Sequence, residues 1–346
     1  MATLQDIAEA AGVSRETVSR VLNGEHKGMR RDAVARARAI QDIARRLGYR
    51  PNAAATALAR GRTQTIGLLY SGDSPLLGNA YGALTDGIAR QLRTFGCSLQ
   101  LVAVDADQPP ADDHFLDRRF DGCLVHHDVS PGVEAALRRA GLPAVLINAT
   151  AATPWPRVLP DDAQGMHMVL DHLLDLGHRH IVLLGYQMTG RHFSSDVREA
   201  AFRRGTAKAG VNGEVITLTA KHDNEEIDLP RLAMSLARRA DRPTAMIVGN
   251  EHKLPTLLRA LRHAKLDVPR DLSLAVFNDA PLQQALEITA VDVPFRLLGD
   301  RGASLLLESI DLNARVEEDN GASPRVLLVP EQLLRRSSTG LPRGKA

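Results

Sequence analysis

The stretch Thr3–Asn23, TLQDIAEAAGVSRETVSRVLN, carries two short helical patterns separated by Gly12. Thr3 and Asp6 have the spacing of a capping box, in which side chains satisfy the free backbone N–H groups at a helix start. Glycine tolerates the left-handed backbone of a sharp helix exit, so the first helix is predicted to end at Gly12. Apolar residues three or four apart give this helix one buried face: Leu4, Ile7, Ala8 and Ala11.

The second pattern begins after Ser14, whose hydroxyl is suited to cap a helix start. Its apolar face consists of Val18, Val21 and Leu22, and its polar face of Arg15, Glu16, Ser19 and Arg20. Two short helices, a glycine turn and a polar second helix are typical of the helix-turn-helix, which places its second helix in the DNA major groove. The same pattern fits any small helical hairpin, so other features of the chain must decide between the two interpretations.

Basic residues are concentrated at the beginning of the chain. Residues 1–62 contain twelve Lys or Arg and six Asp or Glu, a net charge of +6, whereas the remainder has a net charge of −4. A basic segment attached to a mildly acidic body indicates that the segment, and not the body, binds a polyanion.

The composition excludes several classes of protein. A length of 346 residues suffices for two or three packed units, and 44% hydrophobic and 24% charged residues are typical of soluble globular proteins. Cys97 and Cys123 are too few for a disulfide framework or a zinc site. The chain shows no apolar signal segment and no run long enough to span a membrane. We therefore expect a cytoplasmic protein without a membrane partner, metal or cofactor.

Two further segments follow the paired helices. A third helix is expected at about residues 31–47, with an inner side of Val34, Ala37, Ile40, Ile43, Ala44 and Leu47. Residues 52–60, NAAATALAR, are rich in alanine and contain Leu58 as their one large apolar residue. A helix this short is unstable alone in water. The segment is therefore either a plain linker or a hinge that becomes helical when another molecule holds it.

The rest of the chain alternates strand-like and helical patterns. Apolar runs suited to buried parallel strands occupy residues 66–70, 98–104, 122–125, 144–147, 181–184, 215–218, 245–248 and 274–277. Helical patterns occupy residues 84–95, 133–140, 166–176, 198–209, 232–240, 254–264 and 297–309. This alternation predicts an α/β fold with helices on both faces of the sheet. Eight strands fit two sheets with a cleft between them better than a single sheet.

These segments closely resemble the lac repressor family of bacterial transcription regulators. The resemblance is most specific in GVSRETVSRVLNG, residues 12–24, and in LGYRPNAAATALARGRTQTIGLL, residues 47–69. Landmarks of the family continue to the end of the chain: HLLDLGHRHIVLLG at 172–185, RPTAMIVGNE at 242–251, VPRDLSLAVFND at 268–279 and VPEQLLRRSS at 329–338. The resemblance implies an all-α helix-turn-helix head followed by two α/β Rossmann-like subdomains of periplasmic-binding-protein type, joined by three crossovers.

The resemblance also implies domain boundaries. We expect a DNA-binding domain at 1–50, a hinge or linker at 51–62, an effector-binding and dimerisation domain at 63–340, and a tail at 341–346. The first subdomain is expected at about 63–160 and 293–321, and the second at about 161–290 and 322–340. The crossovers are expected near Pro160, near Ala290–Pro294 and around Gly321–Arg325. The segment after Gly24 is about four residues longer than we expect in the family, so the role of residues 25–32 stays open.

The head supplies the expected DNA contacts. By resemblance, Arg15, Glu16 and Arg20 occupy base-reading positions. Arginine can donate two hydrogen bonds to guanine and glutamate can accept one from cytosine, although Glu16 could also be an ordinary solvent-facing charge. By resemblance again, Ser14, Thr17 and Asn23 contact phosphates, which sets the register on the DNA. Thr3, Ser19 and Asn52 complete the predicted DNA-binding set.

Leu58 matches the family's wedge residue, which enters the minor groove and separates a central base step. Such a wedge needs one hinge helix from each of two subunits. The resemblance therefore implies a homodimer on a near-palindromic DNA operator.

A small-molecule effector is expected in the cleft between the subdomains, at the carboxyl ends of strands. In this family it is usually a sugar, nucleoside or related metabolite, and we expect a sugar or sugar derivative. Resemblance and position nominate six effector-binding residues: Tyr81, Asn148, Arg198, Asn250, Asn278 and Phe295. Asparagines stand at 148 and 278 where the family typically has aspartate, which predicts a less acidic cleft that prefers an acceptor-rich or anionic ligand. For Tyr81 a plain surface-loop role, and for Phe295 core packing, stay open.

Three classes of function fit parts of the chain. A ligand-regulated transcription factor, by family habit a repressor, explains both the head and the body. A transport-type sugar-binding protein explains the body alone, and the head argues against it. A nucleotide-dependent enzyme is disfavoured because no G-x-G-x-x-G, Walker or G-x-S-x-G motif is present. The sequence thus predicts a regulator and not an enzyme, in which ligand binding shifts the population of DNA-binding states.

Overall fold

A computed structural model describes residues 2–22, 31–49, 62–71, 79–104, 119–126, 131–150, 153–187, 192–219, 229–249, 251, 254–313 and 324–344. The chain divides into two compact units. The first unit, which we call the head, comprises Met1–Gln64 with Arg118–Asp121, and the second comprises Thr65–Asp117 with Gly122–Ala346.

The head contains three helices, α1 (Leu4–Ala11), α2 (Arg15–Leu22) and α3 (Arg31–Arg46). Their apolar faces meet in a small core built around Ile7, Val18 and Ile40. The predicted third helix is confirmed, but its inner face is shorter than predicted. Val34 and Leu47, at its two ends, are 38% and 43% exposed because they lie beyond the part of α3 that the shorter helices cover.

The turn between α1 and α2 has the predicted chemistry. The Thr3 hydroxyl accepts the Asp6 N–H and the Asp6 carboxylate accepts the Thr3 N–H, which completes the capping box. Gly12 adopts φ 63°, a left-handed conformation that glycine reaches without a steric penalty. The Ser14 hydroxyl accepts the Thr17 N–H at the start of α2.

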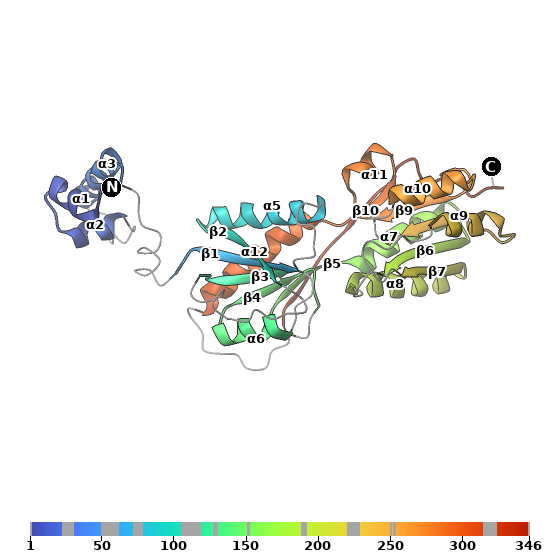
Figure 1. Cartoon of the computed structure of the whole chain (residues 1–346), viewed down its shortest axis with the longest axis horizontal. Coiled ribbons are helices and arrows are strands. Elements are labelled where there is room, and N and C mark those ends of the chain that lie inside the picture. The colour runs from blue at the N-terminus through green and yellow to red at the C-terminus, as the bar shows by residue number, and fades with distance from the viewer. Residues whose placement is uncertain are drawn as a thin grey trace. The chain divides into compact units, whose positions relative to one another are not determined.

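The first sheet has the strand order β11-β5-β4-β3-β1-β2 and is parallel throughout. Its strands are β1 (Thr65–Ser71), β2 (Ser98–Val104), β3 (Gly122–His126), β4 (Ala144–Ile147), β5 (Arg157–Pro160) and β11 (Val326–Val329). Helices α5 (Asn79–Thr94), α6 (Pro131–Ala140) and α12 (Phe295–Asn313) cover it, with α5 and α12 packed together on one face and α6 on the other (Figure 1). We call this part the first subdomain.

The second sheet has the order β12-β10-β9-β8-β6-β7 and is parallel except for β12, which runs antiparallel to β10. Its strands are β6 (His180–Gln187), β7 (Asn212–Thr219), β8 (Ala245–Val248), β9 (Ser273–Phe277), β10 (Thr289–Asp292) and β12 (Gln332–Leu334). The helices of this second subdomain are α7 (Asp162–Asp175), α8 (Phe193–Ala209), α9 (Leu229–Arg238), α10 (Leu254–His263) and the short α11 (Pro281–Ala285).

Strand β6 shows how both faces of the second sheet are buried. Ile181 and Leu183 belong to the core that includes α7 and α8, whereas Val182 and Leu184 belong to the core that includes α9 and α10. Successive side chains of a strand point to opposite faces, so a continuous apolar run is required here. The predicted α/β fold with two sheets is thus confirmed.

In the described part of the chain, the backbone passes three times between the sheets, after β5, after β10 and after β11. One predicted boundary is wrong. We assigned all of 322–340 to the second subdomain, with the crossover around Gly321–Arg325, but β11 pairs with β5 and belongs to the first sheet. The third crossover is therefore Pro330–Glu331, between β11 and β12. The other two passages, after Pro160 and after Asp292, fall near the expected positions.

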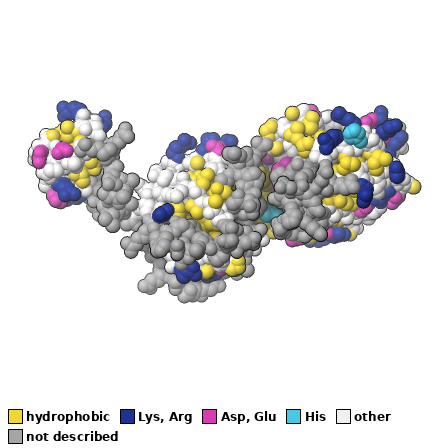
Figure 2. Space-filling view, viewed as in Figure 1, with side chains coloured by type: hydrophobic (Ala, Val, Ile, Leu, Met, Phe, Trp, Pro, Cys, Tyr) yellow, Lys and Arg dark blue, Asp and Glu magenta, His cyan; other side chains and the backbone are white. Residues whose placement is uncertain are grey.

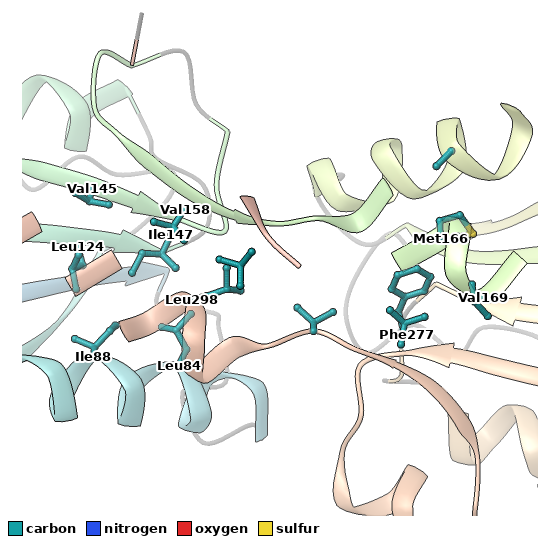
Figure 3. Close-up of a cluster of buried hydrophobic side chains, with 14 of the residues drawn as sticks. Leu84, Ile88, Leu124, Val145, Ile147, Val158, Met166, Val169, Phe277 and Leu298 are labelled. Carbon is teal, nitrogen blue, oxygen red and sulfur yellow. The ribbon is translucent and has the colours of Figure 1, made fainter. Parts of the chain in front are cut away.

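A hydrophobic cluster extends through both subdomains. Figure 3 shows Leu84, Ile88 and Leu298 at the first sheet, and Met166, Val169 and Phe277 at the second. Phe277 ends β9 and is fully buried, so the end of a central strand is anchored beside the crossovers.

No helix in the described part of the chain is both long enough and apolar enough to cross a membrane.

Candidate DNA-binding surface and effector cleft

The exposed face of α2 carries the predicted base-reading residues. Arg15, Glu16 and Arg20 are all exposed, while Val18 and Val21 on the opposite side are buried in the core of the head. Because the buried residues fix the rotation of the helix, the three polar side chains stand together on its outer side. An exposed helix of this kind can place guanidinium donors and a carboxylate acceptor against base edges.

The start of α2 is held by a local hydrogen-bond network. The Ser14 and Thr17 hydroxyls lie 3.1 Å apart and form a hydrogen bond. Backbone and Ser14 hydrogen bonds, with smaller contributions from Arg15 and Arg20, lower the pKa of Glu16. Glu16 is therefore a charged acceptor at neutral pH, as reading of a cytosine amino group requires.

Of the remaining predicted DNA-binding residues, two lie in the described part of the chain. Thr3 is exposed and caps α1, and Ser19 is half-buried on α2. Asn23, Asn52 and Leu58 lie outside the described residues, as do residues 25–30 of the longer segment. The face of the head visible in Figure 2 mixes basic, acidic and hydrophobic side chains.

Asp121 fixes the segment that follows the predicted hinge. Its carboxylate accepts the Thr63 N–H at 2.6 Å, the Thr63 hydroxyl at 2.9 Å and the Gln64 N–H at 2.8 Å. Sequence reasoning missed this residue, because the partners are separated by 57 and 58 positions in the chain.

A pocket of about 180 Å³ lies between the two subdomains. The first subdomain contributes Ala80 and Ala83 of α5 and the start of α12, and the second contributes the residues that follow β8, β9 and β10. Among its lining residues are two of the predicted effector contacts, Asn278 and Phe295. Phe295 also packs against the hydrophobic cluster, so both of its proposed roles are compatible with its position.

Asn278 follows β9 with φ 71°, a left-handed conformation in which asparagine is enriched among non-glycine residues. Its amide nitrogen donates to Glu251 Oε2 at 2.5 Å. Its amide oxygen is buried and accepts no hydrogen bond from any described residue. Asn278 thus lines the pocket and contains a buried acceptor without a donor among the described residues.

Asn148 stands at the matching position in the first subdomain, directly after β4, with φ 54°. It is buried, and its backbone carbonyl accepts a hydrogen bond from His192 Nε2 at 3.1 Å. The other ring nitrogen of His192, Nδ1, accepts the Ser194 N–H at 3.3 Å, which assigns the ring proton to Nε2. This contact links the end of β4 to the start of α8. Asn148 does not line the 180 Å³ pocket.

Tyr81 lies in the first turn of α5, with its ring edge-on to His126 at a centroid distance of 4.7 Å. His126 ends β3 and is buried. Tyr81 is therefore part of the first subdomain's inner edge and does not line the 180 Å³ pocket. Asn250, also predicted, lies outside the described residues.

Arg198 is buried in a charge-paired network. Its Nε and Nη2 both lie 2.6 Å from Asp162 Oδ1, and Nη1 donates to the Gly249 carbonyl at 2.7 Å. Its guanidinium also stacks on the Phe277 ring at 3.9 Å. Asp162 thus already neutralises Arg198, one of the predicted effector contacts.

Three of the four charged residues that line this pocket are acidic. These are Glu251, Asp279 and Asp292, and none of the three was nominated from the sequence as an effector contact. Arg336 neutralises Asp279 through two hydrogen bonds of 2.7 and 2.8 Å. Burial, and then repulsion by Asp279, raise the pKa of Asp292, and Arg336 partly opposes them. The one lining arginine, Arg296, pairs with Asp86 at 3.2 Å.

Within the described residues, no group of three or more His, Cys, Asp or Glu side chains is arranged to hold a metal ion.

Two protein-family models match the sequence. Residues 3–52 match the bacterial regulatory proteins of the lacI family, and residues 170–339 match the periplasmic binding protein-like domain. The transcriptional regulator PtxS of Pseudomonas plecoglossicida is 30% identical over 317 residues, which cover 89% of each chain. The chain belongs to the lacI family. As a lacI-family protein, it is a DNA-binding transcriptional regulator with a sugar-binding-type domain, and not an enzyme.

Two solved structures of transcriptional regulators share the fold. The lac repressor dimer bound to operator and an anti-inducer has a TM-score of 0.75 and 23% identity, covering 98% of this chain and 99% of the other. A complex of the transcriptional regulator CelR with cellobiose has a TM-score of 0.66 and 24% identity, covering 98% and 100%.

Proposed function

We propose that this lacI-family protein is a homodimeric, cytoplasmic repressor that binds a near-palindromic operator and is controlled by a small effector in the cleft between its subdomains. The observation that carries the proposal is the exposed set of Arg15, Glu16 and Arg20 on α2 in a chain that also has an intersubdomain pocket. The operator complex of the related lac repressor dimer and the cellobiose complex of CelR support it.

The groups at the pocket favour a ligand rich in hydrogen-bond donors. Asp292 and Glu251 supply carboxylate oxygens, and Asn278 supplies an amide oxygen that has no donor among the described residues. Acceptors that are buried without a partner cost free energy, which a ligand hydroxyl or amine recovers on binding. Arg198 and Arg336 are already paired with carboxylates. We therefore propose a neutral polyhydroxylated or amino sugar in place of the anionic ligand that the sequence predicted.

A thermal-shift comparison tests this ligand class. Neutral sugars, amino sugars and sugar acids are added separately to the full chain, and calorimetry measures the affinity of any that raise the melting temperature. The expected result is stabilisation by neutral or amino sugars and none by sugar acids. Tight binding of sugar acids alone would contradict the proposed class.

Two variants locate the ligand. Asp292→Asn keeps the size of the side chain at the pocket but removes its charge, so it should weaken binding of an active sugar. Asp175→Asn is the matched control, because Asp175 is exposed at the end of α7 and does not line the pocket. Equal affinities of the two variants would place the ligand elsewhere.

The regulatory step is a shift between DNA-binding states. A ligand changes operator affinity only through its different affinities for these states. Addition of an active sugar should therefore change the amount of operator bound in a mobility-shift assay. If a ligand binds with unchanged operator affinity at saturation, the cleft does not control DNA binding.

A further inference from the structure

Glu331 is an acidic residue buried at the third crossover between the subdomains. Only 3% of it is exposed, and its N–H donates to Gln164 Oε1 at 3.1 Å. Neither carboxylate oxygen has a hydrogen-bond partner among the described residues. An ionised carboxylate in such a place is costly, because water is excluded and no donor replaces it.

The backbone around Glu331 is tightly packed. A Cβ atom on Gly165 would collide with the Glu331 carboxylate, and it would also lie 2.9 Å from a methyl group of Val291. Helix α7 and strand β10 thus enclose the side chain. The Glu331 carboxyl group occupies the space that a side chain at Gly165 would fill.

The charged groups around Glu331 are mostly acidic. Asp161 and Asp162 face it from the start of α7, Asp292 faces it from β10, and Arg198 faces it from α8. Arg198 opposes the three aspartates, but it already makes its closest contacts to Asp162 and the Gly249 carbonyl. Burial is the largest cause that raises the pKa of Glu331, to about 8, and the three aspartates add to it.

These acidic groups occupy all three crossovers. Asp161 and Asp162 follow β5, Asp292 ends β10 and Glu331 precedes β12. A change in the arrangement of the subdomains has to bend the chain at these segments, because no other described part of it passes between the sheets. Any rearrangement that lets water reach Glu331 changes its affinity for a proton.

We propose that the Glu331 carboxyl group is a proton-binding site that stabilises the packed crossovers when protonated, so that pH regulates the arrangement of the two subdomains. An effect of this proton on effector affinity would rest on the proposed function, because it requires that the cleft binds an effector. The proton site itself does not, because it can be measured without effector or operator.

The sign of the effect follows from proton linkage. The packed crossovers hold the proton more tightly than an opened state in which Glu331 has its ordinary pKa near 4.5. The stabilisation is complete below that value and is lost as pH rises towards about 8. The ratio of opened to packed crossovers should therefore rise about tenfold per pH unit between these limits and level off above them.

Hydrogen exchange of the full chain measures this ratio directly. Protection factors, corrected for the intrinsic pH dependence of exchange, are recorded from pH 5.5 to 9 for peptides covering 161–166, 289–294 and 329–334. Strand β8 (Ala245–Val248) is the internal reference for global unfolding, because all four of its residues are buried. We expect protection of the crossover peptides to fall with pH relative to β8.

Two variants separate this site from other causes. Glu331→Gln cannot lose a proton, so its crossover protection should not change with pH. Glu308→Gln is the matched control, because Glu308 is 58% exposed in an ion pair with Arg325, and it should behave like the parent chain. A pH-dependent fall that persists in Glu331→Gln, or no fall in the parent chain, would overturn the proposal.

Infrared spectroscopy of the parent chain gives a second measurement that does not depend on a variant folding. A protonated carboxyl group has a C=O stretch distinct from that of a carboxylate. The expected result is a protonated-acid band that persists at pH 7 and disappears as pH rises through about 8. Complete loss of such bands by pH 6 would show that Glu331 is ionised and would refute the proposal.

Discussion

Single side chains on α2 carry the DNA specificity in this account. Arg15→Ala removes an exposed guanidinium and should cost about 1–3 kcal/mol on the cognate operator, with relaxed preference at one base pair. Fluorescence anisotropy on the operator and on its single-base variants measures both effects. An equal loss on every DNA sequence would mean that Arg15 contacts phosphate and not a base.

His178 gives the second subdomain an acid-sensitive contact. Its Nε2 lies 3.0 Å from the Gly340 carbonyl and its Nδ1 lies 2.8 Å from the Thr244 hydroxyl. Since a carbonyl only accepts, Nε2 carries the proton and Nδ1 accepts from the hydroxyl. Burial is the main cause that lowers the pKa of His178. The neutral ring is therefore the form that this site stabilises.

The pH dependence of stability follows from that shift. The contribution of His178 is present above the ordinary histidine pKa of 6.5 and is lost as pH falls below it, by up to about 1.4 kcal/mol per pH unit. The difference in unfolding free energy between the parent and His178→Asn should therefore shrink between pH 7 and pH 5. Urea denaturation at each pH measures it, and a constant difference would mean that His178 titrates normally.

At the scale of elements, α5 and α12 approach each other through glycines. A Cβ on Gly87 would collide with the backbone of Arg296, and one on Gly299 would collide with the backbone of Leu84. Backbone cannot give way as a flexible side chain can. The close contact of these two helices therefore requires both glycines.

A pair of substitutions in α5 tests this packing. Gly87→Ala should destabilise the chain by about 1–3 kcal/mol, because it overpacks a contact that has no free space. Gly82→Ala in the same helix meets no atom within 4 Å and should stabilise by about 0.5–1 kcal/mol through helix propensity. Thermal unfolding of both variants is the measurement. Similar shifts in melting temperature would show that helix propensity, and not packing, governs both sites.

Elements with strong periodicity were predictable, and short elements at the crossovers were not. All eight predicted strands exist, because buried parallel strands need continuous apolar runs. The prediction missed the short strands β5, β10, β11 and β12, although it found β4 and β8, which are equally short but wholly apolar. Their absence from the prediction is also why the third crossover was placed too early.

For the whole molecule, sequence patterns located the cleft but not its charge. Apolar runs in the sequence predict the parallel strands, whose carboxyl ends meet at one edge of each sheet, and the cleft is expected at that edge. Its chemistry depends on pairings such as Arg198 with Asp162 and Arg336 with Asp279, whose partners are 36 and 57 residues apart. Those pairings neutralise both arginines. The acidic lining of the pocket could only be recognised once distant segments were brought together.

The central claim is that two copies of the chain read DNA through α2 under the control of the cleft. Selection of binding sites from a random DNA pool by the full-length protein tests its DNA half most directly. We expect enrichment of a near-palindrome with two G/C-containing half-sites, which the Arg15→Ala variant fails to select. A single asymmetric site, or no enrichment above the random pool, would contradict it.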